Sequence, residues 1–175
     1  CDNDRVGAAL LAYQGGMEGG DAMAALLTGK ANPCGKLPDT FARDLADYPS
    51  TDRFHQSPHY VEYVEDIYVG YRYFETVPGM AERVVYPFGY GLSYTNFALE
   101  TVHTQAEDGR IWVEVQVTNT GDRPGQEVVQ LYACPPRGLL QKPARNLVAF
   151  QKTRLQAPGE SQTVKLSFAV ADMAS

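Results

Sequence analysis

Residues 98–133 read ALETVHTQAEDGRIWVEVQVTNTGDRPGQEVVQLYA, a stretch in which apolar and polar side chains alternate. Such alternation is typical of strands that turn one face to a core and the other to water. In the middle of the stretch, the apolar residues share one side: Ile111, Val113, Val115 and Val117. The opposite side receives Trp112, Glu114 and Gln116. The pattern predicts consecutive antiparallel strands.

Turn sequences divide this part of the chain into short strands. They lie at Asp108-Gly109, between Asn119 and Gly125, and at Pro158-Gly159. Residues 147–170 add two or three strands around the last of these turns. Short strands with a turn every ten residues or so indicate an antiparallel sandwich, which typically has about seven strands. We recognise about five at most, so residues 98–175 are expected to form a sandwich without its last strands.

Residues 1–97 follow a different pattern, with short helices and long loops. Apolar residues at helical spacing predict a helix in 5–13, and a glycine-rich turn separates it from a second helix that begins near Asp21 and ends at Gly29. Residues 42–60 are polar and contain prolines, which predicts a long surface excursion. Residues 61–74 are rich in β-branched and aromatic side chains and are expected to be extended. The fold class is therefore α/β followed by all-β.

Composition excludes several classes of protein. The chain of 175 residues is 44% hydrophobic, has a net charge of −6 and has a pI of about 5.0. No basic stripe is present, which argues against nucleic acid or an anionic membrane surface as partner. No apolar run approaches the roughly 18 residues that span a bilayer. The absence of an Asn-x-Ser/Thr acceptor removes one hint of secretion and slightly favours the cytoplasm, although the compartment stays open.

Cofactor and metal motifs are incomplete. Residues 29–36 have one residue too many between their glycines for a phosphate-binding loop, and Gly89-x-Gly91 is half of a dinucleotide fingerprint. His55 and His59 lie four apart with Glu62 behind them, but the intervening proline makes one continuous helix improbable. Two solvated histidines are the preferred interpretation, and a loop metal site is the alternative. No cofactor is expected.

The three cysteines and the carboxylates complete the chemistry. Cys1, Cys34 and Cys134 form no CxxC pair, so free thiols are expected, with a Cys34–Cys134 bridge as the alternative. Glu18 lies at a helix start, where the dipole favours its charged form and an anchoring role. Glu65 lies early in the stretch 61–74, ahead of the strand expected there, and faces either a cleft or solvent. No two carboxylates form a convincing catalytic pair.

Several motifs in series resemble the C-terminal half of family 3 glycoside hydrolases, the β-glucosidase-like enzymes. They read GGMEGGDAMAALLTGKANPCGKLPDTF (15–41), YVEDIYVGYRYFET (63–76), YPFGYGLSYTNF (86–97), and GDRPGQEVVQLYACPP with LVAFQKTRLQAPGES (within 121–161). They occur in the family's order and cover most of the chain.

The resemblance implies an enzyme with three domains. A barrel carries the nucleophilic Asp, an α/β sandwich often supplies the acid/base Glu, and a fibronectin type III-like domain packs behind. Residues 1–97 would be the C-terminal portion of the α/β sandwich, and residues 98–175 the fibronectin-like domain. Both catalytic residues would lie outside the matching stretches, and the barrel could precede or follow them. The chain alone would be inactive.

The resemblance also gives the 86–97 stretch a place. It contains five aromatic rings and two glycines in twelve residues. We expect it to form the junction of the two domains, with most rings packed in the seam and the glycines allowing close backbone approach. Stacking of some rings, Tyr90 and Tyr94 above all, on sugar faces is the alternative.

The function expected from these motifs is part of a retaining hydrolase that cleaves terminal glycosidic bonds of glucosides or oligosaccharides. The chain would supply cleft wall and scaffold and would associate with the barrel and the carbohydrate substrate. A non-catalytic carbohydrate-binding or structural fibronectin-like module is the alternative. Candidate substrate-binding residues are Glu18, Glu65, Tyr71, Arg72 and Tyr90. Arg72 would either pair with Glu18 or Glu65 or donate to sugar hydroxyls. Lys36 is expected at a structural strand end, with a role near the substrate as the alternative.

Overall fold

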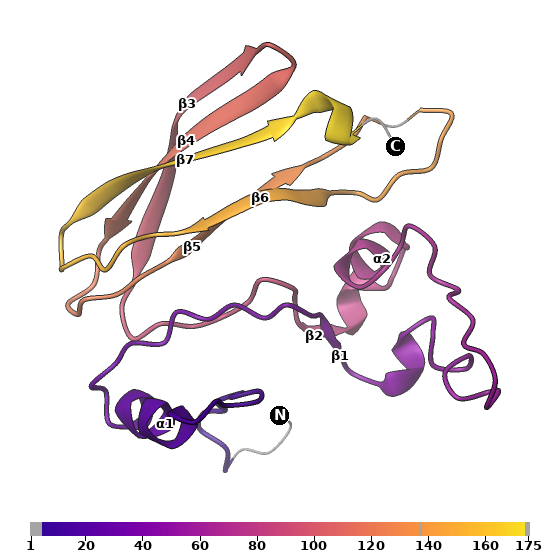
Figure 1. Ribbon diagram of the computed structural model, residues 1–175, viewed down its shortest axis with the longest axis horizontal. Helices are drawn as coiled ribbons and strands as arrows, with labels where there is room; N and C mark the ends of the chain where they lie inside the picture. Colours follow the sequence, from indigo (N-terminus) through magenta and orange to yellow (C-terminus); the bar gives the residue numbers. More distant parts are fainter. Residues whose placement is uncertain (1–4, 137, 174–175) are drawn as a thin grey trace.

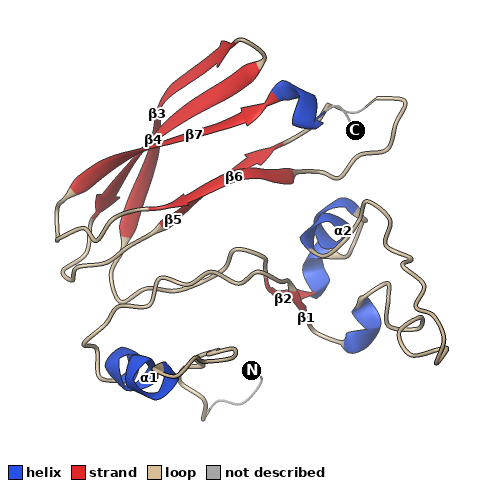
Figure 2. Ribbon diagram, in the orientation of Figure 1, coloured by secondary structure: helices blue, strands red, loops and turns tan. Residues whose placement is uncertain are grey.

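The computed structural model describes residues 5–136 and 138–173 (Figure 1). Two antiparallel sheets face one another in the second half of the chain. The larger sheet has the order β3-β4-β7, and the smaller one pairs β5 with β6 (Figure 2). Their bounds are β3 Phe97–Glu107, β4 Arg110–Asn119, β5 Val128–Ala133, β6 Asn146–Lys152 and β7 Ser161–Ala169. A short 3-10 helix, Val170–Met173, follows β7. The expected antiparallel sandwich is confirmed.

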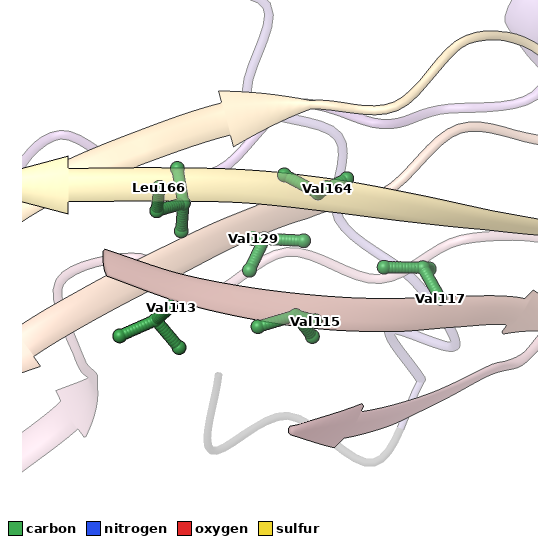
Figure 3. Packing of buried hydrophobic residues seen from close by; sticks show 6 residues of the cluster. All are labelled: Val113, Val115, Val117, Val129, Val164 and Leu166. Atoms are coloured by element: carbon green, nitrogen blue, oxygen red, sulfur yellow. The ribbon is translucent and has the colours of Figure 1, made fainter. Parts of the chain in front are cut away.

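The core lies between these two sheets. Its buried side chains come from β4, β5 and β7 and point toward one another (Figure 3): Val113, Val115, Val117, Val129, Val164 and Leu166. The three valines of β4 alternate with the outward-facing Trp112, Glu114 and Gln116, as the sequence pattern predicted. Burial of six branched side chains is what makes this half of the chain a folded unit.

The predicted turns take backbone conformations that their residues favour. Asp108 and Gly109 connect β3 to β4 with φ angles of 49° and 71°, the left-handed pair that a tight hairpin requires. Gly159, before β7, also has a positive φ of 76°. These turns fix the register of β4 between its two neighbours.

The first half of the chain contains short elements joined by long loops. Their bounds are α1 Gly19–Leu27, β1 Phe41–Ala42, the 3-10 helix Leu45–Asp47, α2 Tyr71–Thr76, the 3-10 helix Ala81–Arg83 and β2 Val84–Tyr86. Strands β1 and β2 pair with each other. Asp21 lies in the first turn of α1, and Gly29 follows its end with a φ of 72°, so the predicted second helix is confirmed. Residues 42–60 form the expected surface loop.

Two predictions for this half are wrong. Residues 6–13 are not helical; Leu10 and Leu11 are 43% and 53% exposed. Every residue from 6 to 13 is exposed, and a helix this short needs a buried face for its stability. Residues 71–76 are helical, although the whole stretch 61–74 was expected to be extended. Here Phe74 is buried against Tyr48, with ring centroids 5.4 Å apart, and this contact overrides β-propensity.

Helix length and polarity bear on membranes. No helix within the described residues combines enough length and apolar character to cross a bilayer.

Candidate functional site

A pocket of about 420 Å³ lies between the β1 region and the N-terminal end of α2. Its lining combines carboxylates, a hydroxyl and aromatic rings: Asp39, Thr40, Tyr48, Glu65, Gly70 and Phe74. Such a mixture of rings and a few polar groups is typical of small-molecule sites. Of the residues that the sequence singled out, only Glu65 lines this pocket, next to the helix that carries Tyr71 and Arg72.

Tyr48 holds the wall of the pocket in place. Its hydroxyl donates to the carbonyl oxygen of Thr40 and accepts from the backbone N–H of Ala42, both at 2.8 Å. Thr40 is only 6% exposed, and its Oγ1 has no hydrogen-bond partner. The aromatic edge of Phe74 completes this wall. The segment before β1 is therefore rigid, and one hydroxyl in it is unsatisfied.

The two carboxylates of the pocket differ in exposure. Glu65 is partly buried, and its backbone carbonyl accepts from the N–H of Tyr68 in a turn that contains Asp66 at a φ of 53°. Asp39 is exposed. Sequence reasoning missed Asp39, whose only signal was its position at the end of the extended piece LPDTF.

Tyr71 and Arg72 begin α2 and are both partly buried. The Tyr71 ring stacks on Phe88 at 4.7 Å and meets Tyr132 edge-on at 6.0 Å, and its hydroxyl accepts from the N–H of Leu147. Tyr71 is therefore enclosed by packing on several sides.

Arg72 does not form the ion pair that was expected with Glu18 or Glu65. Its guanidinium carbon lies 5.9 Å from the centroid of the Tyr71 ring, and its buried Nε has no hydrogen-bond partner. Glu18 is exposed at the start of α1, which is a different element from the α2 helix that carries Arg72. No ion pair among the described residues joins α2 to Glu18. The donor of Arg72 is thus free for another acceptor.

The remaining candidates lie apart from the pocket. Glu18 is the residue before α1, and its side chain makes no capping hydrogen bond. Tyr90 is 37% exposed and lies 5.4 Å from the ring of Tyr86. The structure therefore does not bring all five candidates into one site.

The histidines and cysteines form no metal site in the part of the chain that the structure describes. His55 lies against Phe54, with ring centroids 4.2 Å apart, and Glu62 instead pairs with Arg53 at 3.1 Å. Cys34 and Cys134 are free, which confirms the preferred interpretation for these two, and Cys1 lies outside the described residues.

The 86–97 stretch lies in the seam between the two halves. Phe88 reaches the sandwich through Tyr71 and Tyr132 on β5, and Phe97 packs against the valine core. Packing is confirmed for these two rings. Gly89 has a φ of 79°, and a Cβ there would collide with the side-chain amide of Gln130, which donates to the Gly89 carbonyl oxygen at 3.3 Å. Close approach therefore requires glycine at this position.

Charged pairs also cross the seam, and no sequence pattern predicted them. Lys36 Nζ lies 2.8 Å from Glu127 Oε1. Arg145 forms a two-pronged pair with Glu75 on α2, and this hydrogen bonding raises the pKa of the Arg145 side chain. Burial raises the pKa of the neighbouring Tyr132 hydroxyl. Pairing across long sequence separations depends on the fold, so it is invisible before the fold is known.

Family comparisons agree with this arrangement of two modules. The model of the glycosyl hydrolase family 3 C-terminal domain matches residues 1–94, and that of the fibronectin type III-like domain matches residues 127–175. The chain thus contains a glycosyl hydrolase family 3 C-terminal domain followed by a fibronectin type III-like domain. It belongs to glycosyl hydrolase family 3.

Relatives with curated names are β-glucosidases. Beta-glucosidase A of Butyrivibrio fibrisolvens is 53% identical over 99% of this chain and 23% of its own length. A beta-glucosidase of Ruminococcus albus is 46% identical over 96% of this chain and 17% of its own length. The chain therefore spans less than a quarter of these relatives.

Solved structures give the same result. Beta-glucosidase 3B from Thermotoga neapolitana in complex with alpha-D-glucose matches with a TM-score of 0.85 and 45% identity, over 93% of this chain and 23% of that chain. A beta-glucosidase from Paenibacillus barengoltzii matches with a TM-score of 0.84 and 51% identity, over 89% of this chain and 17% of that chain.

Proposed function

We propose that the chain is the supporting part of a retaining β-glucosidase that cleaves terminal glucosides. The observation that carries the proposal is the 53% identity to beta-glucosidase A along 99% of the chain. A solved relative with 45% identity was crystallised with glucose, which supports a glucose-containing substrate. Retention requires two carboxyl groups about 5–5.5 Å apart, one as nucleophile and one as acid/base.

The residues described here fit a supporting role better than a catalytic one. Asp39 and Glu65 are the two carboxylates that line the pocket, and Asp39 is exposed. A general acid needs an enclosed environment that keeps it protonated, and an exposed carboxylate lacks this. We therefore place the nucleophile and the acid/base in other parts of the protein, with a (β/α) barrel as the domain against which this wall packs.

Within the wall, Glu65 and Arg72 are the residues that we propose face the substrate cleft. Glu65 lines the pocket, and Arg72 has a buried donor without a partner in the described structure. Sugar hydroxyls accept and donate hydrogen bonds, so a carboxylate and an Arg donor both suit them. Tyr71, enclosed between Phe88 and Tyr132, is proposed to hold α2 in place. Glu18 and Tyr90 stay weaker candidates because they lie elsewhere.

The reaction is tested on the full-length protein with an aryl β-glucoside. Release of the phenol, together with an initial product that is the β-anomer of glucose by NMR, would agree with a retaining β-glucosidase. An initial α-anomer, or no hydrolysis of any aryl glycoside, would contradict the proposal. The 175-residue chain assayed alone should release no more phenol than a buffer blank.

The role of the wall is tested with Glu65→Gln in the full-length protein. Loss of one hydrogen bond to substrate should raise KM about threefold to tenfold, with a smaller change in kcat. Glu82→Gln, at an exposed position in the 3-10 helix Ala81–Arg83, is the matched control and should leave KM unchanged. Equal KM values for the two variants would remove Glu65 from the site.

A further inference from the structure

The outer face of the β3-β4-β7 sheet carries the only tryptophan of the chain. Trp112 lies on β4, the central strand, and is 42% exposed. Its neighbours along β4, Ile111 and Val113, point the other way into the core. A large ring turned to solvent in the middle of a sheet contributes nothing to the valine core and is available to a ligand.

Polar side chains flank the ring on both sides. Gln105 of β3 and Ser167 of β7 lie directly opposite Trp112 in the two antiparallel registers. Neighbouring strands are about 4.8 Å apart, so hydrogen-bonding groups border the ring within the width of one sugar residue. The Arg110 guanidinium lies 5.7 Å from the ring centroid and donates to Ser167 Oγ at 3.0 Å. Such a cation–ring contact is weak at an exposed site, so a ligand can displace it.

The same face continues along β4 as a row of polar side chains. Two residues beyond Trp112 comes Glu114, flanked by His103 and Lys165, and two further comes Gln116, flanked by Glu100 and Thr163. Each two-residue step advances about 6.6–6.8 Å. The face is therefore long enough for a ligand with several units, one stacked on the ring and the next ones over polar groups.

Charges of both signs lie on this face and nearly balance: Arg110 and Lys165 are positive, and Glu100, Glu107 and Glu114 are negative. Lys165 Nζ lies 2.7 Å from Glu114 Oε1, and this hydrogen bond lowers the pKa of Glu114. Gln105 donates to Glu107 at 3.0 Å. A surface with compensated charge, many hydroxyl and amide groups and one exposed ring suits an uncharged polyhydroxyl ligand better than an ionic one.

The face also points away from the rest of the chain. Contacts with the first half include those of Gln130, Tyr132, Arg145 and Leu147, on β5, β6 and the segment before β6, and that of Glu127 before β5. Figure 1 shows β5 and β6 on the side of the sandwich nearest α2, with the β3-β4-β7 sheet beyond them. A ligand on the outer face would not compete with the seam.

From these observations we propose that the outer face of β3, β4 and β7 is a binding platform for a neutral glucan chain, with Trp112 as its stacking residue. The proposal adds to the proposed function a surface that holds a polysaccharide away from the cleft, and its choice of a glucan rests on that function. Aromatic stacking on the apolar face of a pyranose supplies the affinity, and the flanking polar groups select a hydroxylated ligand.

The test is affinity electrophoresis of the full-length protein in native gels cast with soluble mixed-linkage β-glucan. Wild type should be retarded relative to a gel without glucan. Trp112→Ala should weaken binding about tenfold, and Trp112→Phe should keep part of the retardation. Phe150→Ala is the control, because Phe150 is a 69% exposed ring on β6 and its removal should leave retardation unchanged.

Each result decides the question. No retardation of wild type, or equal retardation of wild type and Trp112→Ala, overturns the platform, and so does a Trp112-dependent change of oligomeric state without glucan binding. Thermal melting checks that Trp112→Ala folds, and Trp112→Phe serves if it does not. Aryl glucoside hydrolysis, measured in parallel, should be the same in all variants. If no variant hydrolyses the glucoside but retardation depends on Trp112, the proposed function fails and the platform stands.

Discussion

Replacing Lys36 with methionine should loosen the join between the first half of the chain and the β-sandwich, because Glu127 would lose its counter-ion. Lys36 Nζ lies 2.8 Å from Glu127 Oε1 and donates to the carbonyl oxygen of Gly91 at 3.0 Å. The two side chains are only 17% and 15% exposed. Neither charge can therefore be well solvated when its partner is removed.

The size of the effect follows from this burial. Breaking a buried pair by removing one partner costs about 3–5 kcal/mol. Residual exposure, and the hydrogen bond that Glu127 still accepts from Val128 N–H, reduce the expected loss for Lys36→Met to about 2–3 kcal/mol. The double variant Lys36→Met with Glu127→Gln leaves no unpaired charge, so it should recover about 1–2 kcal/mol relative to additivity.

The measurement is urea unfolding followed by circular dichroism. Lys165→Met is the matched control, because the Lys165–Glu114 pair has exposed fractions of 68% and 29%, and loss of such a surface pair should cost less than about 1 kcal/mol. Equal losses for Lys36→Met and Lys165→Met, or strict additivity in the double variant, would refute the claim that a buried ion pair joins the two halves.

Three further changes test the seam and the sandwich. Phe88→Ala should cost about 3 kcal/mol in urea unfolding because it removes the ring stacked on Tyr71; an unchanged midpoint would place that ring outside the packing. Gly89→Ala should lower Tm more than Gly79→Ala, since both have positive φ but only Gly89 faces a neighbouring side chain; equal losses would mean that backbone strain alone matters. In Glu160, hydrogen bonds from the Ala157 N–H and from Arg154 lower the pKa of the carboxyl group from 4.5. The loss of Tm in Glu160→Gln relative to wild type should therefore be full above about pH 4.5 and should vanish as the pH falls through the lowered pKa. A loss of Tm that persists in acid would exclude these hydrogen bonds as its cause.

The sandwich could be predicted because its information is local. Alternation along β4 identifies the core face, and Asp108-Gly109 identifies the hairpin turn. Both signals lie within a few residues of the structure that they specify. Even so, Leu99 shares the core face with Val117 and is 50% exposed. Alternation therefore predicts which face of the sheet a side chain lies on, but not whether other residues cover that face.

The first half could not be predicted as well, because its structure depends on distant contacts. Helix α2 forms where Phe74 packs on Tyr48, and the sequence around it favours a strand. Residues 6–13 have helical spacing, but all of them are exposed. Periodicity therefore gives the right element only where the implied apolar face is covered.

The candidate site divides in the same way. The family motifs drew attention to Glu65, which lines the pocket, and to Tyr71 and Arg72, which begin α2 directly after the pocket residue Gly70. No local pattern in the sequence indicated the roles of Asp39, Lys36 and Glu127, because those roles depend on residues far along the chain. Charged side chains acquire a role from what the fold places opposite them.

A last consequence concerns how the first half is stabilised. Within the described residues up to 96, Phe74 is the only buried hydrophobic side chain, whereas β4, β5 and β7 together bury eight. So small a core cannot offset the conformational entropy of that many ordered residues. Contacts with the sandwich must therefore stabilise the first half of the chain. These are the ring contacts, the Lys36–Glu127 pair and the Arg145–Glu75 pair. The remaining apolar surface, including Leu10 and Leu11, needs cover from other parts of a protein whose relatives are more than four times as long as this chain.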